Sequence, residues 1–269
     1  MATGLKLFLA THPGIAANLA DIHGNSEHAS LAMNPTAFMA ALEAGHMFSK
    51  DTFTRIGGGH TYLAAGWTVT TTGTSAAAAQ ATTAGGGVKL TCGSDSTFNT
   101  NLQSIQPWTP VADKWMLAHC RVQASDITTV GWEFNIGASA VDPATTNYTD
   151  VFGLKMAVGA GTVLGKVRGN SGTQVTSSTL YTMAATTDAY FGLLFKLSAT
   201  EANNAGCFFY GSNIMNITGI TDVSAITGAK AQMAAILTSP PSMYMNLHAK
   251  GSAGNPTITF TSAFGQVDN

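Results

Sequence analysis

Apolar and polar residues alternate with a period of two through most of the chain, from about residue 61 onward. Trp132, Phe134 and Ile136 are apolar, whereas the intervening Glu133 and Asn135 are polar. The same alternation recurs in five further runs, namely Met116, Ala118, Cys120 and Val122; Phe152, Leu154, Met156 and Val158; Phe191, Leu193, Phe195 and Leu197; Met243, Met245 and Leu247; and Ile258 and Phe260. One apolar and one polar face per strand is typical of antiparallel sheets that share a core.

Turn-rich segments separate these runs, at residues 73–87, 137–150, 169–178 and 199–206. The pattern predicts about ten or eleven strands in an all-β antiparallel sandwich or jelly roll. A parallel βαβ fold is excluded because no helical pattern lies between the strands.

Two segments depart from the pattern. Residues 220–237 are expected to form a crossover loop or one short helix, because residues 229–237 are rich in alanine and precede two prolines. Residues 68–83 are rich in threonine and alanine, which leaves a mobile loop or an edge strand as alternatives.

The N-terminal 60 residues have a different character and hold five of the seven histidines. Asn34 is a good helix N-cap, and Pro35 suits the first helical position. Met33 and Phe38 are spaced for a hydrophobic staple. We therefore predict an N-terminal arm over residues 1–60, with a helix at about 35–48, followed by a sandwich domain over residues 61–269. The apolar residues of the arm that are candidates for a partner interface are Met33, Phe38, Leu42 and Phe48.

Charge is scarce, because charged residues make up 10% of the chain against about 25% in typical soluble domains. The formal net charge is −2 and no run of Lys and Arg is present, so nucleic-acid binding is not expected. A charge-poor surface suits a protein packed against copies of itself or against a shell, although an ordinary Thr-rich soluble sandwich has the same composition. No apolar stretch is long enough for a membrane helix, and we expect a soluble protein made in the cytoplasm. The odd number of cysteines (Cys92, Cys120 and Cys207) predicts buried free thiols.

Known catalytic motifs are missing from the sequence. Glycoside hydrolases with sandwich folds place two or three carboxylates on one strand in a Glu-x-Asp-x-Glu alternation, but Glu133 stands alone. Neither a Gly-x-Ser-x-Gly elbow nor a phosphate-binding loop is present. We therefore predict no catalytic residue, no cofactor site and no enzymatic activity.

Metal and sugar sites have weak candidates only. Residues 21–28 combine two histidines with two carboxylates at a spacing that matches no standard site. Asp142, Asn147 and Asp150 lack the ligand spacing of a calcium loop, so no metal site is assigned. A sugar-stacking platform could come from the aromatic residues Trp67, Trp108, Trp115, Trp132, Tyr148, Tyr181, Tyr190, Tyr210 and Tyr244. Packing in the core or between subunits is the commoner role of such residues.

The segment from about Gly66 to Gln266 resembles the concanavalin A-like, laminin-G-type jelly roll. The resemblance rests on the strands at residues 132–137 and 191–196 and on the Cys207–Gly211 stretch, which follows a short polar turn. Charge-poor sandwiches of this kind with an N-terminal arm also resemble the auxiliary capsid proteins of tailed bacteriophages.

That resemblance implies a structural virion protein, a capsid decoration or head-surface protein. Its arm would bind the major capsid protein, other virion proteins or neighbouring copies. It would form a homo-oligomer, a trimer being one option, and reside in the virion after assembly in the host cytoplasm. The alternative is a receptor- or glycan-binding module of a phage fibre or tail, with Tyr148 as a candidate glycan contact.

Overall fold

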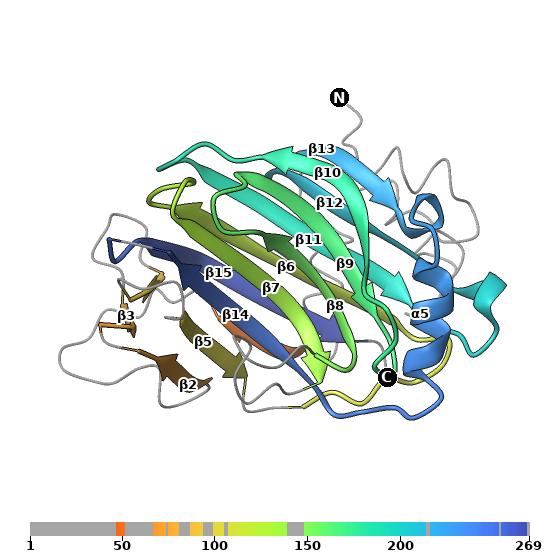
Figure 1. Ribbon diagram of the computed structural model, residues 1–269. Coiled ribbons are helices and arrows are strands. Elements are labelled where there is room, and N and C mark those ends of the chain that lie inside the picture. Colours follow the sequence, from red (N-terminus) through yellow and green to blue (C-terminus); the bar gives the residue numbers. More distant parts are fainter. Residues whose placement is uncertain are drawn as a thin grey trace.

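The computed structural model describes residues 47–51, 67–73, 75–80, 87–93, 99–104, 107–138, 148–213, 216–252 and 254–267. Within these ranges fifteen strands form two antiparallel sheets that pack face to face (Figure 1). The predicted all-β antiparallel sandwich is confirmed. The number of strands exceeds the prediction because strands also form in segments that the sequence assigned to a turn or to the arm, such as residues 77–80 and 47–51.

Sheet A has eight strands in the order β13-β12-β11-β6-β15-β4-β3, and β1 pairs with β15 off this path. Its strands are β1 (Met47–Asp51), β3 (Ala77–Gln80), β4 (Val88–Thr91), β6 (Trp115–Ala124), β11 (Asp188–Lys196), β12 (Ala205–Asn213), β13 (Asn216–Asp222) and β15 (Thr257–Val267). Sheet B has seven strands in the order β10-β9-β8-β7-β14-β5-β2. Its strands are β2 (Trp67–Thr72), β5 (Asn99–Ser104), β7 (Val130–Ala138), β8 (Val151–Met156), β9 (Thr162–Arg168), β10 (Val175–Thr182) and β14 (Met243–Gly251).

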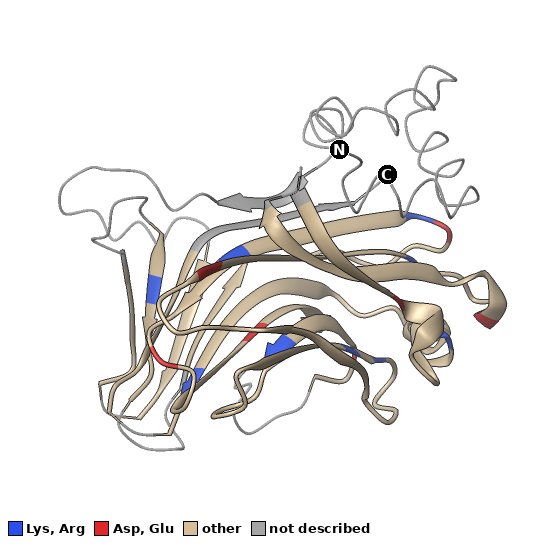
Figure 2. Ribbon diagram, turned by 90° about the horizontal axis from the view of Figure 1, so that it is seen from above, with Lys and Arg blue, Asp and Glu red and all other residues tan. Residues whose placement is uncertain are grey.

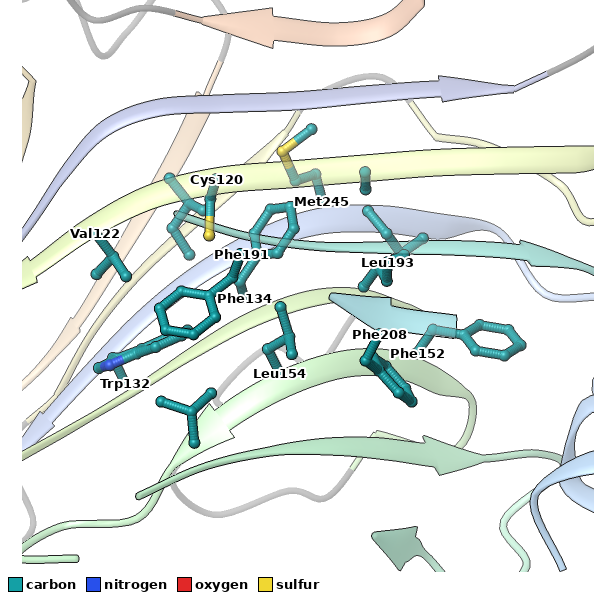
Figure 3. Packing of buried hydrophobic residues seen from close by; sticks show 14 of the residues in the cluster. Cys120, Val122, Trp132, Phe134, Phe152, Leu154, Phe191, Leu193, Phe208 and Met245 are labelled. Carbon is teal, nitrogen blue, oxygen red and sulfur yellow. The ribbon is translucent and has the colours of Figure 1, made fainter. Parts of the chain in front are cut away.

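The core fills the space between the sheets with the apolar side chains that the alternation predicted (Figure 3). Trp132 on β7 meets Phe191 on β11, with ring centroids 5.3 Å apart. Phe152 on β8 stacks on Phe195 of β11 at 3.7 Å. All four tryptophans are buried, as are the three free cysteines. The period of two therefore identified the inward face correctly, except that Val158 lies in the turn after β8.

A single α-helix, α5 (Ala229–Ile236), lies within the described ranges, and two short 3-10 helices precede it, η2 (Glu201–Asn203) and η3 (Val223–Ala225). Ala229, Met233 and Ile236 face the core from α5. A side chain at Gly169 would come within 2.0 Å of the Gln232 carbonyl, so only glycine lets α5 approach the end of β9 this closely. Of the two alternatives for residues 220–237, the structure has the short helix.

Residues 67–72 and 77–80 form edge strands, β2 and β3, rather than a loop. The predicted turn segment at residues 169–178 is confirmed over residues 169–172, where Asn170 and Ser171 adopt φ of 46° and 58°. The rest of the predicted turn segment is wrong from Val175 onward, where β10 begins.

The predicted arm helix is wrong at its C-terminal end. Met47 and Phe48 belong to β1, whose backbone pairs with β15 from Met47↔Gln266 to Asp51↔Ala263. An extended backbone can form hydrogen bonds with the open edge of β15. A helix at the same residues could not, because its N–H and C=O groups bond to one another within the helix. Met33, Phe38, Leu42 and the boundary at residues 60–61 lie outside the described residues.

Candidate binding face

The outer face of sheet B is polar, although most of its side chains are buried. On β7, Trp132, Phe134 and Ile136 point into the core, so Glu133 and Asn135 point outward. Cross-strand pairing adds outward residues from β5, β8, β9 and β14. We call the resulting set the polar face, and its members are Asn101, Glu133, Asn135, Lys155, Lys166, Asn246 and His248.

An ion pair lies at the centre of the polar face. The Lys166 ammonium is 2.5 Å from Oε2 of Glu133, and the Asn135 amide donates to the same oxygen at 2.8 Å. The Lys166 side chain is 3% exposed and that of Glu133 is 27% exposed. The pair is therefore shielded at the lysine and reachable from solvent at the carboxylate.

Burial and charge act in opposite directions on the Glu133 carboxyl. Burial raises its pKa, but the charges of Lys166 and His248 and the hydrogen bonds from Lys166 and Asn135 outweigh that effect and lower the pKa to about 2. Burial also lowers the pKa of Lys166, and the Glu133 charge works against this. Glu133 is consequently a carboxylate at neutral pH, able to accept hydrogen bonds but not to deliver a proton.

Tyr148 lies against this ion pair. The Lys166 ammonium is 5.3 Å from the centroid of the Tyr148 ring, within the range of a cation–π contact. A side chain at Gly137 would come within 2.9 Å of the ring, so a glycine in β7 makes room for the tyrosine. Burial raises the pKa of the Tyr148 phenol, and the nearby Glu133 charge raises it further. With 5% of its surface exposed, Tyr148 is not an open stacking platform.

Three short amides form the floor of the polar face. Asn101 donates to Oδ1 of Asn246 at 3.5 Å, and Asn246 donates to the Tyr244 carbonyl at 3.0 Å. Oδ1 of Asn101 is buried and accepts no hydrogen bond within the described part of the chain. Such an acceptor is costly to bury without a partner, and therefore indicates either strain or a missing ligand. Glycine at position 153 leaves space for the third amide, because a side chain there would come within 2.0 Å of Asn135 Oδ1.

Longer side chains surround this floor and are half-buried, namely Gln103, Lys155, Tyr244 and Lys250. At the end of β9 a hollow of about 450 Å³ is lined by Arg168 and residues 171–174. The Arg168 guanidinium donates to the carbonyls of Gly172, Tyr148 and Ser171, which fixes it in place. The floor, the half-buried rim and the hollow make this end of sheet B the best candidate for a binding site.

The sequence-based site candidates have mixed outcomes. Glu133 is an outward strand residue with no second carboxylate among its described partners, as the sequence indicated, and Lys166, His248 and Asn135 interact with it. Asp150 accepts a hydrogen bond from the backbone N–H of Asn170 at 2.6 Å, whereas Asp142, Asn147 and residues 21–28 lie outside the described residues. No group of three or more potential metal ligands occurs in the part of the chain that the structure describes. In the same part, no helix is long and apolar enough to span a membrane.

Sequence reasoning missed Lys166, Asn101, Asn246 and His248. Each occupies an outward position of a strand that alternates, and this was the available signal. The signal is incomplete because the sequence does not show which strands are neighbours: the Lys166–Glu133 contact joins residues 33 apart, and the Asn101–Asn246 contact joins residues 145 apart.

No family model and no curated protein matches the chain. Solved structures do match. The globular domain of calreticulin from T. cruzi is 12% identical, with 83% of this chain and 88% of that chain covered and a TM-score of 0.57. The potassium-bound carbohydrate recognition domain of Emp46p is 8% identical, with 81% and 96% covered and a TM-score of 0.52. A glycosyl hydrolase family 16 protein from Mycobacterium smegmatis is 13% identical, with 82% and 100% covered and a TM-score of 0.47.

Identities this low establish the fold alone. The neighbours include lectin-like carbohydrate-binding domains and glycosyl hydrolase domains. None of these likenesses bears on a bacteriophage origin, so the role in a virion or capsid stays a prediction. The chain has the concanavalin A-like jelly-roll fold, as the sequence resemblance implied.

Proposed function

We propose that this protein is a glycan-binding module and that the polar face of sheet B is its binding surface. The observation that carries the proposal is the buried amide floor, where Oδ1 of Asn101 has no donor within the described residues. Sugar hydroxyls both donate and accept hydrogen bonds, and a few fixed amide and carboxylate groups are the usual means of orienting such a ligand. The partly exposed carboxylate of Glu133 supplies a second acceptor.

The fold supports this proposal as an analogy. The Emp46p domain, described as a carbohydrate recognition domain, shares the jelly roll over 81% of this chain. Fold alone does not transfer a ligand. The proposal therefore depends on the side chains of this chain's own sheet B.

Binding without hydrolysis is part of the proposal. Hydrolysis of a glycosidic bond needs two carboxyl groups roughly 5–9.5 Å apart, one of which must be able to donate a proton. The outward positions of β7 are Glu133, Asn135 and Gly137. They have the spacing of a Glu-x-Asp-x-Glu strand, but only the first of them carries a carboxylate. Because its pKa is low, Glu133 is ionised at neutral pH and cannot serve as the general acid.

The charges on this face favour an acidic glycan. Lys155, Lys166, Arg168 and Lys250 occupy outward positions of β8, β9 and β14, against the single carboxylate of Glu133 on β7. Lys166 is neutralised by Glu133, and Arg168 is bonded to backbone carbonyls. Lys155 and Lys250 remain on the half-buried rim, where they can attract a ligand carboxylate or sulfate.

A glycan array containing neutral and acidic glycans tests the proposal. We expect binding by the full chain, and a loss of at least tenfold in affinity for Asn101→Ala. The matched control is Asn203→Ala, in exposed η2, which should bind like the wild type. Thermal unfolding of both variants verifies that they fold. If no glycan binds, or if Asn101→Ala binds as well as the control in a folded protein, the polar face is not the site.

A structural role in a bacteriophage particle is the second candidate. The specific observation in its favour is the scarcity of charge over both sheets (Figure 2), which lowers the repulsion between neighbouring copies. This role predicts self-association, which light scattering over a range of concentrations would detect. A chain that is monomeric at every concentration would contradict the predicted homo-oligomer.

A further inference from the structure

The outer face of sheet A carries a second set of large apolar side chains. Inward residues of β6 and β11, such as Cys120 and Phe191, belong to the core between the sheets. The residues that alternate with inward ones point the other way. On three adjacent strands several of them are apolar, next to polar residues such as His119, Arg121 and Lys196. We call the apolar ones the outer patch, and its members are Trp115, Leu117, Tyr190, Leu194, Cys207 and Phe209.

Pairing between the strands makes the outer patch continuous. Leu117 on β6 pairs with Leu194 on β11, which in turn pairs with Cys207 on β12. The Tyr190 ring lies 6.3 Å from the Phe209 ring. The Phe209 ring covers Gly192, where a side chain would come within 2.2 Å of it. The patch is thus a packed surface and not a set of scattered apolar residues.

The outer patch is buried, with every member at most 6% exposed. Among the described elements, those packed against β6 and β11 are their neighbours in sheet A and, across the core, β7 and β8 of sheet B. None of these lies over the outer face. Three aromatic and two leucine side chains would otherwise form an apolar patch of several hundred Å², which soluble monomers rarely expose.

The path of the chain indicates what covers this patch. Met47, the first described residue, pairs with Gln266 on β15, and Gln266 pairs with Leu117 on β6. Because paired strands lie about 4.8 Å apart, Met47 is roughly 10 Å from Leu117. The segment of 46 residues that precedes Met47 therefore enters the sandwich at the row of paired residues that contains Leu117, Leu194 and Cys207.

We propose that the outer patch is a docking surface for the N-terminal segment of the same chain, through the apolar residues Met33, Phe38 and Leu42. The sequence predicts a helix that begins at Pro35, and Phe38 and Leu42 share one face of it. A helix over residues 35–46 would be about 18 Å long, which is enough to cross β6, β11 and β12. This docking is independent of the proposed glycan site, which lies on the other sheet.

Cys207 provides the test, because it lies in the outer patch, while Cys120 faces the inter-sheet core from the neighbouring part of sheet A. The full chain is labelled with N-ethylmaleimide under native conditions, and peptide mass spectrometry follows each thiol. We expect the wild type to protect both thiols. Phe38→Glu/Leu42→Glu should label Cys207 at least tenfold faster while Cys120 stays protected, which shows that the sandwich is folded.

The matched control is Thr36→Glu/Ala40→Glu, which adds the same charge on the opposite face of the predicted helix and should leave Cys207 protected. Binding of the dye ANS, which reports exposed apolar surface, is the second measurement and should rise only in the Phe38/Leu42 variant. Unchanged Cys207 labelling and ANS binding in that variant would overturn the proposal. Cys207 labelling in the wild type that rises on dilution, together with a dimer by light scattering, would make a second copy the occupant and would also overturn it.

Discussion

The two sheets of this sandwich use their outer faces in opposite ways. Sheet B has a floor of amides with an ion pair at its centre, so its outward residues interact through hydrogen bonds and charge, while Oδ1 of Asn101 is left without a donor among the described residues. Sheet A has a packed apolar surface that includes Trp115, Leu194 and Phe209. Both faces are largely buried, but burial has a different meaning on each.

Burial of a polar face is costly unless each group has a partner, whereas burial of an apolar face is favourable by itself. The polar face therefore requires accurate placement, which Gly137 and Gly153 allow by admitting Tyr148 and Asn135. The outer patch requires only a cover of suitable shape. Recognition of a small polar ligand suits the first face, and docking of a chain segment suits the second.

The largest expected effect comes from placing a charge on the apolar face. Leu194→Asp would bury a carboxylate beside the apolar side chains of Leu117 and Cys207, and we expect a loss of at least about 3 kcal/mol in the free energy of unfolding. The exposed Thr179→Asp, on β10 of sheet B, should change it by less than about 0.5 kcal/mol. Urea unfolding at pH 7 measures both. Equal effects would show that the outer patch is open to solvent.

Removing half of the ion pair on the polar face should have the next largest effect. Glu133→Gln leaves the buried Lys166 ammonium without its counter-charge, and we expect a loss of about 3 kcal/mol. This is the lower end of the range for broken buried pairs, because the lowered pKa of Lys166 favours its neutral form. The double variant Glu133→Gln/Lys166→Met should recover part of the loss. A double variant whose loss equals the sum of the single losses would mean that the two groups do not interact.

The stability of the polar face should depend on pH through Glu133. The folded state lowers the pKa of Glu133 from 4.5 to about 2, so its stabilising contribution is complete above pH 4.5 and is lost as the pH falls toward 2. The difference in unfolding free energy between the wild type and Glu133→Gln should therefore shrink over this window. Urea unfolding of both proteins at several pH values measures it. A difference that stays constant from pH 6 to pH 2 would contradict the low pKa.

The fold was predictable because its signal is local. The alternation at residues 132–136 assigned the inward face from five consecutive positions, and the alanine-rich run after Gly228 marked α5. The outer patch also has a local signal, because Phe208 and Phe209 are adjacent and both buried. A strand that is apolar at consecutive positions is buried on both faces, so the burial of β12 on both sides was predictable from these two residues.

The polar face was not predictable to the same degree, because it is assembled by strand order. Asn101, Glu133 and Asn246 come from β5, β7 and β14, which are neighbours in sheet B although β14 is more than a hundred residues away in the chain. Periodicity assigns a residue to a face but does not choose its partner across the sheet. Likewise, β1 is a strand because an edge of β15 is available to it, and no residue within Met47–Asp51 indicates that edge.

The smallest expected effect separates ligand attraction from stability on the polar face. Lys155 is half-buried on the rim beside Glu133, with which it pairs across β8 and β7. Lys155→Gln should change the free energy of unfolding by less than about 0.5 kcal/mol, because the Lys155 side chain is partly exposed to solvent. Its affinity for an acidic glycan should fall several-fold, and the fall should be smaller at high salt because ions screen the lost attraction. Lys89→Gln, exposed on β4 of sheet A, is the matched control. A loss of affinity that is the same for neutral and acidic glycans would show that Lys155 contributes to the steric fit and not through its charge. The predicted preference for acidic ligands would then be wrong.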